Sequence, residues 1–287
     1  MIKAVVAVLV ILGLGACNDD PAALTVVGYN ARHSDLDEGA FSWEARRDVA
    51  LEVLTALDAD LIGLQEAAED QRRDLEALGL DCIECGGDFS NHNAILYRAD
   101  RLEARISGTF WLSDTPEVPE STSWGNELPR WVTWTEVQPR GKPSSTRFLV
   151  YNTHLDHQSQ PSRMESLHAI MAHAREHARG ETGTLPIILM GDLNAKPDWP
   201  ELDFLLNAHP EYPHLPLRDV LAREGADDDA DGTYHGFDGT PDLDRIDYIL
   251  VSEGIGSRRG AIITEEGTDG TPPSDHFPVC AEIVLSE

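Results

Sequence analysis

Short apolar runs, each bounded by polar or turn-forming residues, recur along most of the chain. Runs rich in Val, Ile, Leu and aromatic residues are typical of β-strands, and a run that is apolar at nearly every position indicates a strand covered on both faces. We therefore predict strands at residues 24–29, 60–65, 94–97, 102–110, 131–137, 147–152, 186–190, 245–251 and 277–285.

Three other segments carry apolar residues at the spacing of a helix. In the first of them Val49, Val53 and Leu57 recur every four residues. The third opens with a proline and a serine, which helix N-termini favour. We predict helices at residues 43–57, 69–78 and 161–179.

The order of these elements predicts an α/β fold. Strands and helices alternate irregularly, and several consecutive strands have no helix between them. That pattern favours two mixed β-sheets packed face to face, with helices outside, over a purely parallel doubly wound sheet. Because no internal repeat or low-complexity linker interrupts residues 24–287, we expect one domain there.

The N-terminal segment differs from the rest of the chain. Its apolar run at 4–14 has the length of a signal-peptide core and is too short to span a membrane comfortably. The Leu-Gly-Ala-Cys sequence ending at Cys17 resembles a bacterial lipoprotein cleavage box. That resemblance implies a signal peptide at 1–16, a lipid on Cys17 and a polar tether at 17–23. The domain would then lie outside the cytoplasm, anchored to a bacterial membrane by the lipid alone. The alternative is an ordinary secretory signal and a soluble secreted or periplasmic protein.

The cysteines do not indicate catalytic chemistry. Cys82 and Cys85 form a lone C-x-x-C pair, whereas a zinc ribbon needs two such pairs. A small loop disulfide and the absence of any bond remain alternatives for this pair. Cys280 lies in an apolar run and is predicted to be a buried thiol.

The charge limits the possible partners. The chain has 51 Asp and Glu residues against 22 Lys and Arg residues, and a formal net charge of −29. Proteins that bind long nucleic acids usually present a basic surface, so we expect no stable binding to duplex DNA. A phosphate-bearing substrate is not excluded, because a metal ion or a local cation can invert the field inside a cleft. Most of the acidity is interpreted as solvated surface.

Polar residues of catalytic type recur at the ends of the predicted strands, except that Asp247 lies within a predicted strand and residues 274–276 open the last one. They occur at residues 29–30, 65–66, 152–157, 191–194, 247 and 274–276. One such Asp or Asn is commonly a turn residue, but six segments in one chain indicate a shared site. Carboxylate and amide oxygens suit a hard divalent cation such as Mg²⁺ better than zinc. A cation, an imidazole and an activated water can together cleave a phosphate ester, so the residues favour a metal-dependent hydrolase.

In this order the segments resemble the endonuclease/exonuclease/phosphatase superfamily, which has the deoxyribonuclease I-like fold. The resemblance runs from about residue 24 to residue 285, and its motifs are Leu-Gln-Glu at 64–66, Asn-Thr-His at 152–154, Gly-Asp-Leu-Asn at 191–194, Arg-Ile-Asp-Tyr-Ile at 245–249 and Ser-Asp-His at 274–276. The resemblance implies a four-layer α/β sandwich, in agreement with the two mixed sheets predicted above.

The same resemblance implies a metal site. Glu66 matches the principal Mg²⁺ ligand, Asn30 lies beside it, and Asp275 matches a further ligand of the metal or of its water. Mn²⁺ is the alternative cation.

The resemblance also implies catalytic roles. His276, held by Asp247, matches the imidazole at the scissile phosphate. Asp192 matches the residue that orients or deprotonates the attacking water. Asn194 matches a neighbour that contacts the phosphate, and His154 a second imidazole that binds a phosphate oxygen.

Four further residues are candidates for contact with the substrate. Arg130 is a candidate phosphate contact, because a planar guanidinium binds two phosphate oxygens at once, and His235 is a candidate pocket residue; a structural role is the alternative for both. Asp156 and His157 belong either to the specificity surface or to the support of the catalytic residues. The acidic segment 225–232 lacks the spaced ligands of a calcium loop and is predicted to be solvated.

The sequence therefore predicts a Mg²⁺-dependent phosphoesterase that hydrolyses a phosphate mono- or diester with metal-activated water. A small molecule or a lipid headgroup is the expected substrate, and a monomer is the expected state. One alternative is a secreted Mg²⁺-dependent nuclease. Another is a non-catalytic lipoprotein that uses the same fold for binding.

Overall fold

The computed structural model of the chain describes residues 23–83, 93–143, 146–180, 183–212, 216–222, 232–237, 245–267 and 270–286. Some of the predictions concern residues outside these ranges. They are the signal peptide, the lipid on Cys17 with nearly all of the tether, the pairing of Cys85, and almost all of the acidic segment 225–232. Within the described part, no helix combines the length and the apolar character needed to cross a bilayer.

The first of two six-stranded sheets has the order β13-β14-β1-β2-β4-β3. Strand β1 runs parallel to β2 and antiparallel to β14, so the sheet is mixed. Its strands are β1 (Ala23–Asn30), β2 (Leu61–Gln65), β3 (Asp81–Ile83), β4 (Ile95–Tyr97), β13 (Ile255–Ile262) and β14 (Val279–Leu285).

The second six-stranded sheet has the order β11-β12-β10-β7-β6-β5. Strand β10 runs parallel to β7 and antiparallel to β12, so this sheet is mixed as well. Its strands are β5 (Leu102–Trp111), β6 (Trp131–Pro139), β7 (Phe148–His154), β10 (Ile187–Asp192), β11 (Arg218–Asp219) and β12 (Asp247–Val251); β8 (Arg179–Gly180) and β9 (Gly183–Thr184) form a separate small pair.

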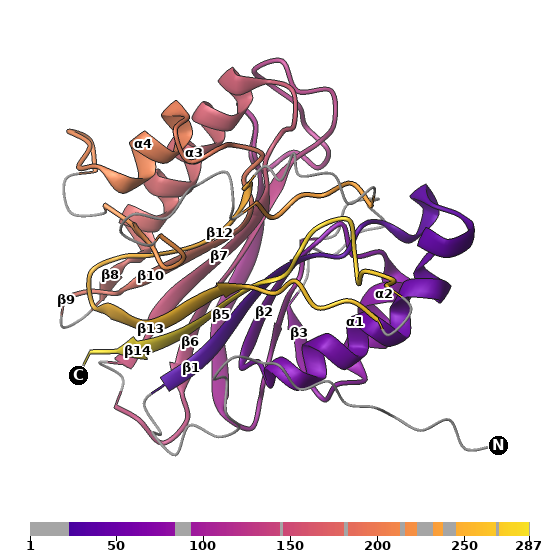
Figure 1. Cartoon of the computed structure of the whole chain (residues 1–287). Coiled ribbons are helices and arrows are strands. Elements are labelled where there is room, and N and C mark those ends of the chain that lie inside the picture. Colours follow the sequence, from indigo (N-terminus) through magenta and orange to yellow (C-terminus); the bar gives the residue numbers. More distant parts are fainter. Residues whose placement is uncertain are drawn as a thin grey trace.

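Helices cover the outer faces of the two sheets (Figure 1). α1 (Trp43–Leu57) and α2 (Glu69–Glu76) lie against the first sheet, and α3 (Gln160–His177) and α4 (Pro200–Leu206) lie against the second. Two short 3-10 helices, η1 (Ser34–Leu36) and η2 (Gly39–Phe41), precede α1. The order helices, sheet, sheet, helices is a four-layer α/β sandwich, which confirms the predicted fold.

The continuous apolar runs of the central strands follow from this layering. In β10, Ile188 and Met190 lie in the core between the sheets, while Ile187 and Leu189 lie in the core under α3 and α4. Successive side chains of a strand point to opposite faces, so a strand covered on both faces must be apolar at every position.

The two sheets approach closely near the ends of β2 and β7. A Cβ atom added at Gly63 of β2 would lie 2.7 Å from Oδ1 of Asn152 and 2.8 Å from Cε of Met190, in the other sheet. The Asn152 amide donates to the carbonyls of Leu64 and Ala94 and accepts from Nε2 of Gln65 at 2.6 Å. This fully buried amide therefore fixes the spacing of the sheets beneath their polar edge.

Several predicted strand ends differ from the observed ones by one or two residues. Strands β1, β7 and β10 extend to Asn30, His154 and Asp192, and the starts of two other strands also affect site residues. Asp247 begins β12 rather than lying inside a strand, and the last strand begins at Val279. Pro278 has no N–H to donate to a ladder, so Asp275 and His276 lie in the preceding loop. An isolated bridge joins that loop to Tyr234.

Other elements were missed because their patterns are weak. Strand β13 contains Gly256, Gly260 and two adjacent arginines, and α4 has only seven residues. The predicted helices at 43–57, 69–78 and 161–179 correspond to α1, α2 and α3. Cys280 is 4% exposed in the core, as predicted.

Candidate active site

The predicted site residues meet where the central strands end. Asn30 is the last residue of β1, Glu66 follows β2, and His154 and Asp192 are the last residues of β7 and β10. Parallel neighbours end at the same edge of a sheet, and the face-to-face packing brings the two edges together. In the second sheet Asp192 stands opposite His154 on one side and opposite Asp247 on the other.

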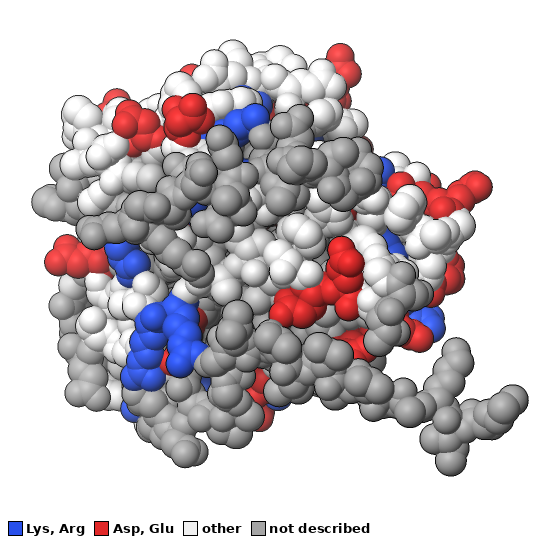
Figure 2. All heavy atoms as spheres, in the orientation of Figure 1, with Lys and Arg blue, Asp and Glu red and all other residues white. Residues whose placement is uncertain are grey.

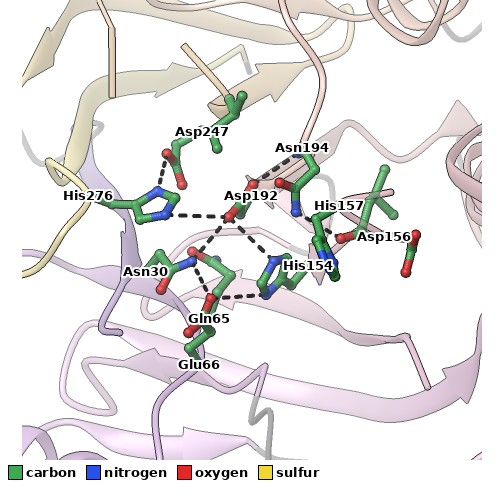
Figure 3. Close-up of polar contacts among 12 residues, drawn as sticks. Asn30, Gln65, Glu66, His154, Asp156, His157, Asp192, Asn194, Asp247 and His276 are labelled. Atoms are coloured by element: carbon green, nitrogen blue, oxygen red, sulfur yellow. Dashed lines mark hydrogen bonds and ion pairs between the residues drawn. The ribbon is translucent and has the colours of Figure 1, made fainter. Parts of the chain in front are cut away.

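Asp192 occupies the centre of this group (Figure 3). Its Oδ2 atom lies 3.1 Å from Nδ2 of Asn30, 3.4 Å from Nε2 of His154 and 3.9 Å from Nε2 of His276. Its Oδ1 atom accepts the backbone N–H of Asn194 at 2.9 Å. With 2% exposure, this carboxylate is shielded from bulk water and faces two imidazoles.

Asp247 holds the second imidazole. Its Oδ2 atom lies 2.8 Å from Nδ1 of His276, and both side chains are buried. The hydroxyl of Thr233 accepts the backbone N–H of Asp247 and so fixes the start of β12. Nε2 of His276 is left facing Asp192.

Burial and charge separate the protonation states of these groups. Burial alone would lower the pKa of His276, but the neighbouring Asp247 raises it to about 10, so this imidazole is cationic at neutral pH. Burial, followed by the charge of Asp247, raises the pKa of Asp192 to about 7. Burial and the charge of Arg130 hold the pKa of His154 well below 6.5, so His154 is neutral. The site therefore combines a cationic imidazole, a neutral one and a carboxylate poised to exchange a proton near neutral pH.

Glu66 and Asp275 supply carboxylate oxygens beside this group. Oε1 of Glu66 accepts from Nδ2 of Asn30 at 3.1 Å, and Oδ2 of Asp275 lies 3.5 Å from Nη1 of Arg32. Burial raises the pKa of Asp275, although the positive charges of His276 and Arg32 oppose that rise. Asn30 faces the carboxylates through its amide nitrogen, while its oxygen accepts the backbone N–H of Arg32.

Three residues at or beside the site have an unusual backbone conformation. Arg32, Glu66 and Asn194 have φ angles of 52°, 55° and 47°, in the left-handed region that non-glycine residues seldom adopt. Such strain persists only where the surrounding structure enforces it, and it commonly marks functional sites. Gly191, with φ 138°, passes so close to β7 that a Cβ atom would lie 1.9 Å from the carbonyl oxygen of Thr153.

The candidate substrate residues lie in different environments. Arg130 and Asp156 are 3% and 2% exposed beside His154, while His157 is exposed at the surface. His235 is buried, its ring lies 4.3 Å from that of Phe277, and its backbone N–H donates to the carbonyl of Asp275. His235 thus supports the loop that carries Asp275 and His276, and a contact with substrate stays a prediction for all four residues.

Three supporting residues were not singled out from the sequence. Gln65 binds Asn152 across the sheets, Arg32 pairs with Asp275, and Thr233 accepts the backbone N–H of Asp247. Gln65 and Asn152 belong to motifs that the sequence did display, but no pattern shows that their side chains meet. The position of Arg32, two residues after Asn30, was the available signal for that residue.

A group of acidic and histidine side chains in the described part could hold a metal ion. Asp192, Asp247 and His276 each offer a ligand atom, and these atoms lie within 4.8 Å of one another. Glu66 offers a further carboxylate, with Oε1 3.9 Å from Nδ1 of His154. That Nδ1 atom is buried without a hydrogen-bond partner among the described residues.

Known structures share this architecture. An endonuclease/exonuclease/phosphatase family protein from Bacteroides thetaiotaomicron has a TM-score of 0.77 and 29% identity, over 92% of this chain and 98% of that chain. The mannosyl-6-phosphatase of Bacteroides thetaiotaomicron has a TM-score of 0.76 and 30% identity, over 91% of this chain and 100% of that chain.

Sequence comparisons agree with the structural ones. An uncharacterized protein of Acanthamoeba polyphaga mimivirus is 30% identical over 129 residues, which are 40% of this chain and only 47% of that protein. The model of the Endonuclease/Exonuclease/phosphatase family matches residues 29–276, a range that includes every residue of the site described above. The chain therefore belongs to the endonuclease/exonuclease/phosphatase family.

Proposed function

We propose that this protein is a Mg²⁺-dependent hydrolase of phosphate esters, with Mn²⁺ as the alternative cation. The observation that carries the proposal is the position of Asp192, a buried carboxylate 3.4 Å from a neutral imidazole and 3.9 Å from a cationic one. A phosphoryl group needs positive charge and hydrogen-bond donors on its oxygens and a base beside the attacking water. Family membership supports the same reaction class.

The chemistry of the donor set fits a hard divalent cation. Glu66 and Asp275 offer carboxylate oxygens, the ligands Mg²⁺ prefers, and Asn30 lies beside Glu66. His276 is the poorer candidate ligand, because its Nδ1 is engaged by Asp247 and a protonated imidazole has no free lone pair. When bound, the cation would supply positive charge to a phosphoryl oxygen.

Residues of the chain itself would activate the water and stabilise the charge on the phosphoryl group. Asp192 orients the attacking water and accepts its proton, as its raised pKa allows. His276, kept cationic by Asp247, donates from Nε2 to a phosphoryl oxygen as charge builds there. His154 and Asn194 are further donors at the same edge, and no covalent enzyme intermediate is required.

A phosphate ester of a small molecule or a lipid headgroup is the proposed substrate. Support comes from the 30% identical relative named as a mannosyl-6-phosphatase and from the charge of −29. On the face drawn in Figure 2, the described Lys and Arg residues form small separate groups among Asp and Glu rather than a continuous basic band. A nuclease would need a more basic path for a long polyanion.

The experiment compares hydrolysis of 4-nitrophenyl phosphate, bis(4-nitrophenyl) phosphate and plasmid DNA, each with Mg²⁺ and with EDTA. The proposal predicts Mg²⁺-dependent cleavage of at least one small ester and little nicking of plasmid at physiological salt. Strong plasmid nicking would promote the nuclease alternative. If the protein is folded, as judged by circular dichroism, and cleaves none of the three substrates, the non-catalytic binding protein would be favoured.

We also propose that the domain is a monomer tethered outside the cytoplasm by a lipid on Cys17. The lipoprotein-like sequence before residue 18 supports this location. Expression of the full chain and of Cys17→Ser in a bacterial host tests the tether by membrane fractionation. Wild type should sediment with membranes, and the variant should lose that association; equal partitioning of the two would contradict the proposal.

A further inference from the structure

Two buried arginines near the site differ in how their N–H groups are used. Arg46 is fully buried and donates to the backbone carbonyls of Ala31, Arg32, Phe41 and Pro273. Arg130 is 3% exposed, yet its Nε and Nη1 atoms have no hydrogen-bond partner in the described part of the chain. Leaving buried charged donors unsatisfied is costly, so Arg130 requires an explanation that Arg46 does not.

The position of Arg130 places this guanidinium beside the catalytic group. Arg130 immediately precedes β6, whose first residues pair with the last residues of β7, and Val132 stands opposite Thr153. His154 is the next residue of β7. The charge of Arg130 is close enough to lower the pKa of His154.

Asp156 and His157 hold the guanidinium from one side. Nη2 of Arg130 lies 3.2 Å from Nδ1 of His157, and Nε lies 3.8 Å from Oδ2 of Asp156. Figure 3 shows Asp156 and His157 on the His154 side of the site, across Asp192 from Asp247. This separation from Asp156 is too long for a direct hydrogen bond, so the carboxylate orients the guanidinium without satisfying its Nε.

The support itself is well fixed. Oδ1 of Asp156 accepts the backbone N–H groups of Gln158 and Ser159. The backbone carbonyl of Asp156 accepts from Arg163, which is paired with the fully buried Glu201 at 2.7 Å. Arg130 is therefore held in place before any substrate arrives, which reduces the entropy lost on binding.

We propose that Arg130 binds the non-bridging oxygens of a phosphate monoester and makes the protein selective for monoesters over diesters. The inference rests on the proposed function and names its substrate class. A monoester presents three non-bridging oxygens and a double charge, whereas a diester presents two oxygens and a single charge. His154 and His276, together with a cation when one is bound, would serve the first two oxygens, and the open N–H groups of Arg130 suit the third.

The test compares Arg130→Gln and Arg130→Lys with wild type on 4-nitrophenyl phosphate and bis(4-nitrophenyl) phosphate. Arg105→Gln is the matched control, because Arg105 is an exposed arginine near the opposite end of the same sheet. Arg130→Gln should lower kcat/KM on the monoester by about a hundredfold and on the diester by less than about fivefold. Arg130→Lys keeps the charge but loses the planar fork, so it should fall between Arg130→Gln and wild type.

Inorganic phosphate, titrated calorimetrically at a pH where it is mainly dianionic, gives a readout that needs no turnover. Wild type and Arg105→Gln should bind it alike, and Arg130→Gln should bind it at least about tenfold more weakly. Equal losses on both esters, a loss below about threefold on the monoester, or unchanged phosphate binding would each overturn the role of Arg130. If wild type cleaves neither ester, the proposed function fails, and the phosphate titration still decides whether Arg130 binds the anion. If Arg130→Gln does not fold, Arg130→Lys is compared with Arg105→Lys by the same two criteria.

Discussion

Nδ1 of His276 lies 2.8 Å from Oδ2 of Asp247, and both side chains are buried at the edge where the two sheets meet. The carboxylate has two effects on its partner. It fixes the ring so that Nε2 faces Asp192, and it raises the pKa of the imidazole to about 10 despite burial. A cationic donor is thereby maintained across the neutral pH range.

Replacement of Asp247 by Asn should remove both effects. The pKa of His276 should fall, since burial is then opposed only by the weaker effects of Asp275 and Asp192. Loss of the positioned charged donor should lower kcat by about a hundredfold to ten-thousandfold. The pKa can be followed by NMR titration of His276 and kcat by ester hydrolysis. A variant with wild-type kcat, or with an unchanged imidazole pKa, would show that Asp247 does not act through His276.

Asn152 should be a stability residue rather than a catalytic one. Replacement by Ala leaves the buried carbonyls of Leu64 and Ala94 and the amide of Gln65 without this partner. Loss of these three buried hydrogen bonds should lower the free energy of unfolding by about 2–4 kcal/mol, measured by urea denaturation. Asn207→Ala is the control, because the exposed Asn207 side chain bonds to Asp203 alone among the residues that the structure describes; this variant should lose less than about 0.5 kcal/mol. Equal effects of the two variants would contradict the bridging role.

Gly191 should tolerate no larger residue. Its φ of 138° is unfavourable for other amino acids, and a Cβ atom would overlap the carbonyl oxygen of Thr153. Gly191→Ala should therefore lower the free energy of unfolding by more than about 3 kcal/mol, or prevent folding. Gly79→Ala separates the backbone strain from the steric overlap. Gly79 also has positive φ, but apart from its chain neighbours no atom of the described residues lies within 4 Å of the added Cβ, so a loss of about 1 kcal/mol is expected. A stable Gly191→Ala protein would contradict the close approach of β10 and β7.

His173 should make the protein less stable in mild acid. Burial, with a smaller effect of His177, lowers the pKa of His173 to about 4, and its Nδ1 lies 2.9 Å from the Tyr151 hydroxyl. In the unfolded chain the pKa of this imidazole is near 6.5, so between pH 6.5 and pH 4 the unfolded chain binds more protons than the folded chain. The free energy of unfolding therefore decreases as the pH falls from about 6.5 towards 4. His173→Gln should lose less stability than wild type between pH 7.5 and pH 5 in urea denaturation. Parallel pH dependences of the two proteins would show that His173 does not contribute.

The fold and much of the site could be predicted because they depend on local patterns. A strand covered on both faces must be apolar throughout, so β10 was recognisable, and the polar residue at its end marked Asp192. Long-range pairing carries no such signal. Asn152 meets the carbonyl of Leu64, which is 88 residues away, only after the sheets have packed.

The burial and the contacts of an individual site residue could not be predicted from the sequence either. Arg130 could be proposed as a phosphate contact from its chemistry, but its burial and its open N–H groups depend on where β6 meets β7. His276 was recognised in its motif and placed at the start of a strand, although Pro278 keeps the ladder from reaching it. Motifs identify the reactive residues, and tertiary packing determines what surrounds them.

We propose that a divalent cation held beside Glu66 supports hydrolysis of a phosphate ester at Asp192 and His276. The most direct measurement is the rate of ester hydrolysis by wild type and Glu66→Gln as Mg²⁺ is titrated into EDTA-treated protein. Wild-type activity should be absent in EDTA and return with Mg²⁺, and Glu66→Gln should lower kcat/KM by about a thousandfold at an unchanged thermal midpoint. Hydrolysis that is insensitive to EDTA, or a Glu66→Gln protein as active as wild type, would show that catalysis does not depend on a cation at Glu66.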